Sequence, residues 1–95
     1  MLQQSATRAA VYQVLDQVLV DRTVSAPSRG AIFSVIDSLR HGSGEREELR
    51  RAETIAVEMH KLEWALRRGD AEASDAAVRE LRTIAASCLD SRISG

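Results

Sequence analysis

The sequence predicts an all-α bundle of four helical segments folded as one domain, residues 1–95, and three observations carry this prediction. The chain has 95 residues, the size of a single domain. It is rich in alanine and has one proline, and these residues carry the smallest and largest helical penalties. Between three short breaks, apolar residues recur every three or four positions, as on amphipathic helices.

The first helical segment is predicted from Gln4 to Arg22, and its apolar residues cover enough of the helix to pack on more than one neighbour. A break follows from Thr23 to Ser28. Within it Ser25 is suited to cap the next helix, and Pro27 is tolerated in a first helical turn. This break permits the first two helices to fold back on their own chain or to swap onto a second chain, and both arrangements stay open.

The second segment is predicted from Pro27 to His41. Phe33 is expected to broaden its buried stripe, which consists of Ile32, Val35, Ile36 and Leu39. The second break contains Gly42, which suits a left-handed position after a helix, and Ser43, which suits an N-cap.

The third segment is predicted from Glu45 to Arg68, with acidic residues in its first turn and arginines in its last, as the helix dipole favours. Glu47 with Arg51 and Glu63 with Arg67 are spaced for ion pairs along the helix. The seam of a bundle is predicted at alternating spacings of three and four: Ala52, Ile55, Met59, Leu62 and Leu66.

The fourth segment is predicted from Ala71 to Arg92, after a tight break in which Gly69 is left-handed and Asp70 caps the new helix. Its buried stripe is Ala77, Leu81, Ile84 and Cys88, widened by Val78, Ala85 and Leu89. Two long helices joined by so short a turn are expected to form a long antiparallel hairpin across which the first two helices pack.

Charge and composition argue against several classes of protein. The formal net charge is −1, whereas nucleic-acid binders normally carry a basic excess. Reading the second and third helices as a DNA-binding pair would set Glu47 and Glu48 against phosphates. No apolar run approaches the roughly 18 residues of a membrane span, so we expect a soluble protein of the cytoplasm. Lys61 is the only lysine among 13 basic residues, a bias typical of GC-rich bacterial genomes.

We predict no catalytic, cofactor or metal site. His60 and Glu63 share a helix face, but no second pair completes a metal site in a bundle. The lone Cys88 forms no internal disulfide and is expected to be a small core residue. One alternative function is histidine phosphotransfer, because that family also uses a histidine on a four-helix bundle. Of its local pattern only Leu62 matches, while Glu63 brings negative charge where phosphate needs positive charge.

A second alternative is a binder of small anions or a small helical enzyme. Chorismate mutases, for example, are helical dimers that hold a dianion with arginines. Here Arg8, Arg22 and Arg29 are expected near the first break and could cluster around such a ligand. Solvated arginines with a few ion pairs are the competing interpretation.

The main functional prediction is a homodimeric protein–protein interaction or regulatory module, with another protein as an open alternative partner. Val57, Lys61 and Trp64 fall opposite the predicted seam of the third helix. A helix with apolar residues on two faces is normally covered on both. Either the bundle buries Trp64 in its own core, or a second chain covers it. We assign the interface to these three residues, since tryptophan is enriched at interface centres.

Overall fold

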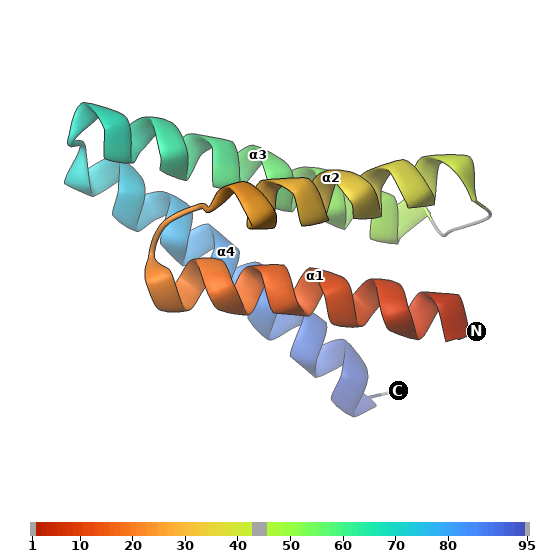
Figure 1. The fold of residues 1–95 in the computed structure, drawn as a ribbon. Helices are drawn as coiled ribbons and strands as arrows, with labels where there is room; N and C mark the ends of the chain where they lie inside the picture. The colour runs from red at the N-terminus through yellow and green to blue at the C-terminus, as the bar shows by residue number, and fades with distance from the viewer. Residues whose placement is uncertain (1, 43–45, 95) are drawn as a thin grey trace.

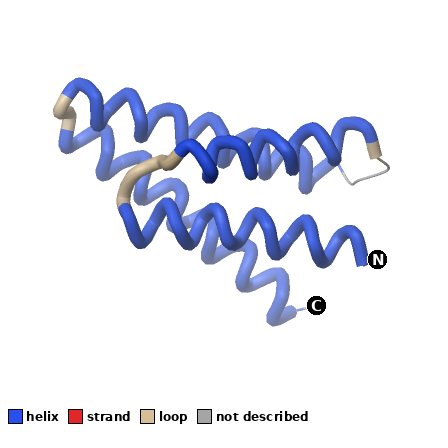
Figure 2. Tube along the Cα trace, viewed as in Figure 1, coloured by secondary structure: helices blue, strands red, loops and turns tan. Residues whose placement is uncertain are grey.

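The computed structural model contains four α-helices, which confirms the predicted all-α fold (Figure 1). The helices are α1 (Leu2–Asp21), α2 (Ala26–His41), α3 (Arg46–Arg68) and α4 (Ala71–Ser94). The structure describes the backbone of residues 2–42 and 46–94, and side-chain surroundings for residues 8–42 and 46–87. This described part contains no strand, as the tube view makes clear (Figure 2).

The four helices form a ring in which each helix packs against two others. The packed pairs are α1 with α2, α2 with α3, α3 with α4, and α4 with α1. Successive helices run in opposite directions, so the bundle has up-down-up-down topology (Figure 1). α2 lies alongside α3, whereas α4 slants away from α3 with distance from their shared turn. No helix in the described part combines the length and apolar character that crossing a bilayer requires.

The core lies between the helices and takes apolar side chains from all four of them. Its buried members are Val11, Val14, Leu15, Val18, Val24, Ile32, Val35, Ile36, Leu39, Ala52, Ile55, Met59, Leu62, Ala77, Val78 and Leu81. The predicted stripe of α2 is therefore buried as expected. On α4, Ile84 and Ala85 pack partly buried against this core, and the side chains of Cys88 and Leu89 lie outside the described residues.

Two apolar residues that we predicted to be buried are exposed instead. Phe33 is 62% exposed, because one residue advances a helix by about 100° and Phe33 therefore points away from Ile32 and the core. Leu66 is 43% exposed, although it shares the seam spacing. It lies in the last turn of α3, level with the first turn of α2, where the bundle ends. Ala65 is buried there in its place.

The capping residues of α2 and α4 behave as predicted. The Ser25 hydroxyl accepts a hydrogen bond from the Ser28 amide at 3.2 Å. The Asp70 carboxylate accepts one from the Ala73 amide at 3.0 Å. Both side chains satisfy an amide that the first helical turn leaves without a backbone partner. Gly69 has a φ of 68°, so the predicted left-handed end of α3 is confirmed.

The ends of α1 and α2 differ from the expectation. Gly42 is extended, with φ −101° and ψ −174°, so its predicted left-handed conformation is wrong. Its amide donates to the Ser38 carbonyl at 2.9 Å, so the last helical turn is completed here without a left-handed residue. The left-handed residue lies instead at the end of α1, where Arg22 has a φ of 55°. The predicted cap Ser43 lies outside the described residues.

The two glycines Gly69 and Gly30 should respond to alanine in opposite ways. Gly69→Ala places a β-carbon in the left-handed region and should cost about 1 kcal/mol of unfolding free energy. Gly30→Ala lies inside α2 with open space around the new β-carbon and should stabilise by about 0.5–1 kcal/mol. Urea unfolding of both variants measures this difference. Equal shifts for the two would contradict the described backbone of Gly69.

Candidate protein interface

The outer surface of α3 carries the three residues predicted for an interface. Val57 is 52% exposed and Trp64 is 48% exposed, and the Lys61 side chain is also mostly exposed. Their spacings of four and three residues place them on one side of the helix. That side lies opposite the buried Ile55, Met59 and Leu62. The bundle therefore does not bury Trp64 in its own core, which was the alternative arrangement.

Two ion pairs across α2 and α3 define how the surfaces of these helices align. Arg29 pairs with Glu63 at 3.2 Å, and Arg40 pairs with Glu53 at 2.8 Å. The two helices are antiparallel, so residues of α2 between these arginines lie level with residues of α3 between these glutamates. Glu63 was predicted to pair with Arg67 of its own helix, but it pairs with Arg29 of α2 instead.

Phe33 belongs to the same surface, and the sequence analysis missed it. It follows Arg29 by one helical turn and therefore shares the side of α2 that is aligned with α3. This alignment sets Phe33 level with the stretch of α3 from Val57 to His60. We call Phe33, Val57 and Trp64 the α2–α3 apolar patch. The exposure of Phe33 could have been predicted from the sequence, because position 33 lies about a quarter turn away from the buried stripe of α2.

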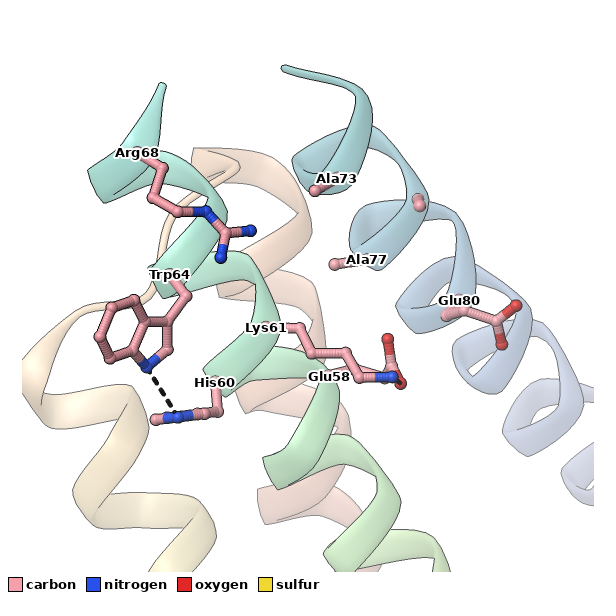
Figure 3. Close-up of a pocket in the computed structure, with 9 residues that line it drawn as sticks. Glu58, His60, Lys61, Trp64, Arg68, Ala73, Ala77 and Glu80 are labelled. Carbon is pink, nitrogen blue, oxygen red and sulfur yellow. Dashed lines mark hydrogen bonds and ion pairs between the residues drawn. The ribbon is translucent and has the colours of Figure 1, made fainter. Parts of the chain in front are cut away.

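Trp64 is held in place by His60, one turn earlier on α3. Its indole Nε1 donates a hydrogen bond to His60 Nε2 at 2.9 Å, and the two rings meet edge to face with centroids 6.2 Å apart (Figure 3). Because Nε2 accepts, the neutral imidazole carries its proton on Nδ1. A side chain fixed before binding loses less conformational entropy when a partner covers it.

This hydrogen bond also bears on the histidine phosphotransfer alternative. His60 is exposed, as that alternative requires. However, the lone pair of Nε2 is engaged by the indole of Trp64. The neighbouring Lys61 donates to Glu58 at 3.1 Å rather than lying over the imidazole. His60 therefore serves as the hydrogen-bond acceptor that orients Trp64.

An open hollow of about 570 Å³ lies between α3 and α4, next to Trp64 (Figure 3). On the α4 side its wall consists of the small side chains Ala73, Ala76 and Ala77. On the α3 side Lys61 and Arg68 line it, together with Trp64 and His60. Figure 3 shows Ala73 and Ala77 facing Lys61 and Arg68 across the gap, whereas the rings of Trp64 and His60 point away from α4. The hollow therefore extends the accessible surface of α3 toward α4.

The three arginines proposed for an anionic ligand are not brought together. Each forms an ion pair with a carboxylate of another helix: Arg8 with Glu48 at 3.0 Å, Arg22 with Asp75 at 2.8 Å, and Arg29 with Glu63 at 3.2 Å. The Arg22–Asp75 pair is exposed on both sides, and pairs of this kind contribute little to stability individually. Glu48 is buried, and its Oε2 has no hydrogen-bond partner among the described residues.

Within the described residues, no group of three or more histidine, cysteine, aspartate or glutamate side chains is arranged to hold a metal ion. No protein-family model, curated protein or solved structure matches this chain.

Proposed function

We propose that this protein is a homodimeric protein–protein interaction module that binds its partner through the outer face of α3. The observation that carries the proposal is the exposed Trp64, which shares a face of α3 with the exposed Val57 and is oriented by His60. Phe33 of α2 adds a third large apolar side chain to the same surface. The expected cytoplasmic location stays a prediction.

The composition of this surface favours contact with a protein. Interface centres are enriched in aromatic residues and depleted in charged ones, and a polar rim surrounds them. The α2–α3 apolar patch has this pattern, because the pairs Arg29–Glu63 and Arg40–Glu53 lie next to it. Lys61, bound to Glu58, contributes a further polar group at its edge.

The size of the chain favours a second copy as the partner. A domain of 95 residues buries a smaller share of its surface than a large one, and association adds buried apolar area. Closed two-fold dimers are the commonest assemblies of identical chains. A different protein remains the alternative partner, and the same measurement separates the two.

The test is the molar mass in solution, measured by light scattering over a wide range of protein concentration. We expect a mass approaching twice the 10.4 kDa of one chain as concentration rises. A mass of 10.4 kDa at every concentration would contradict the homodimer. The described surface would then call for a search for a different protein partner.

A further inference from the structure

We infer that the second copy docks with its α3 antiparallel to the α3 of the first. The two-fold axis that relates them lies between the two helices, perpendicular to both, at the level of the midpoint between His60 and Lys61. This inference rests on the proposed function and adds the arrangement of the two chains. In a two-fold interface the same surface is used twice, so each contact between unlike residues occurs as a symmetric pair. The surface of α3 can therefore be examined for complementarity with itself.

The apolar residues of α3 fit this arrangement. Val57 and Trp64 lie at equal distances on either side of the point between His60 and Lys61. When α3 is turned about that point, Val57 faces Trp64 of the second copy, and Trp64 faces Val57. Both side chains are about half exposed in one chain, so each contact removes apolar area from water on both sides.

The charges of α3 fit it as well. Glu53 and Arg68 also lie at equal distances from the same point, so the axis brings Glu53 opposite Arg68 of the second copy. Glu53 lies on the α2 side of α3, where it pairs with Arg40. Arg68 lies on the α4 side, where it lines the hollow. A two-fold axis perpendicular to both helices keeps the α2 sides of the two copies together. Glu53 and Arg68 of the second copy therefore lie level with each other along the helices and reach toward one another from opposite edges of the contact.

A parallel pairing of the two α3 helices has the opposite electrostatic effect. It would bring Glu53 level with Glu53 and Arg68 level with Arg68, and like charges brought together across an interface repel each other. Lys61 keeps its pair with Glu58 of the same chain in either orientation, because Glu58 lies toward α4. The charge pattern along one helix thus selects the orientation.

Cysteine cross-linking tests this orientation with two single-cysteine chains. Both carry Cys88→Ala; one also carries Glu53→Cys and the other Arg68→Cys, which leaves the apolar patch intact. A disulfide needs Cα atoms within about 7 Å. After mixing and mild oxidation we expect a covalent dimer that joins the two different chains. Neither chain alone should cross-link, because identical positions would lie about 22 Å apart along the antiparallel helices.

The other outcomes are distinguishable. Cross-linking of each chain with itself would show a parallel pairing and overturn the inference. A dimeric mass without any cross-link between positions 53 and 68 would also overturn it, while leaving the proposed homodimer in place. If unaltered protein is monomeric by light scattering, the proposed function itself fails, and that result is obtained before any cysteine is introduced.

Discussion

Replacing Trp64 with alanine is expected to convert the dimer into a monomer without unfolding the bundle. Trp64 has the largest side chain of the apolar patch, and His60 already holds its ring. Truncating such an anchor at the centre of an interface costs about 2 kcal/mol or more, which is roughly a 30-fold loss of affinity. Since the indole is half exposed, its loss opens no cavity in the core. Light scattering measures the mass, and circular dichroism checks the helices.

Val20→Ala is the matched control for this variant. Val20 is 73% exposed, more than Trp64, but it lies near the end of α1 and away from the outer face of α3. Its truncation should leave the association constant unchanged. If Trp64→Ala keeps the mass of the unaltered protein, or if Val20→Ala dissociates the dimer equally well, the proposed face of α3 is wrong.

The largest expected loss of stability comes from Leu62→Ala. Leu62 is completely buried in the core, so the variant loses transfer free energy and leaves a cavity, at a cost of about 2–5 kcal/mol. Leu66→Ala is the comparison, because Leu66 stands one turn later at the same seam spacing but is 43% exposed. Its cost should stay below about 1 kcal/mol.

Urea unfolding, monitored by circular dichroism at fixed protein concentration, measures both free energies. The concentration must be held constant because dimerisation adds to the apparent stability of a chain. Similar losses for Leu62→Ala and Leu66→Ala would mean that the core continues to the end of α3, contrary to the described burial of these two residues.

The positions of the helices could be predicted because they depend on local chemistry. The Ser25 hydroxyl and the Asp70 carboxylate each accept a hydrogen bond from an amide three residues further along the chain. Gly69 adopts the left-handed conformation that ends α3. Caps of this kind mark where helices start and stop whatever packs around them. The limits of α2, α3 and α4 consequently agree closely with the predicted ranges.

The surface could be predicted only in part, because it depends on which helices become neighbours. Val57, Lys61 and Trp64 were found from the spacing within one helix. The position of Phe33 beside them depends on the alignment of α2 with α3. Glu63 illustrates the same difficulty, since it has an arginine in its own helix but pairs with Arg29 of α2. Spacing along one helix does not distinguish these partners.

The position of the single tryptophan also determines what the protein's own fluorescence reports. Trp64 is the only tryptophan of the chain, so its emission comes from one known place, the face that we propose is covered on association. A half-exposed indole emits at longer wavelength than a buried one. Dilution of unlabelled protein should therefore shift the emission as the two chains separate, and the shift measures occupancy of this face directly.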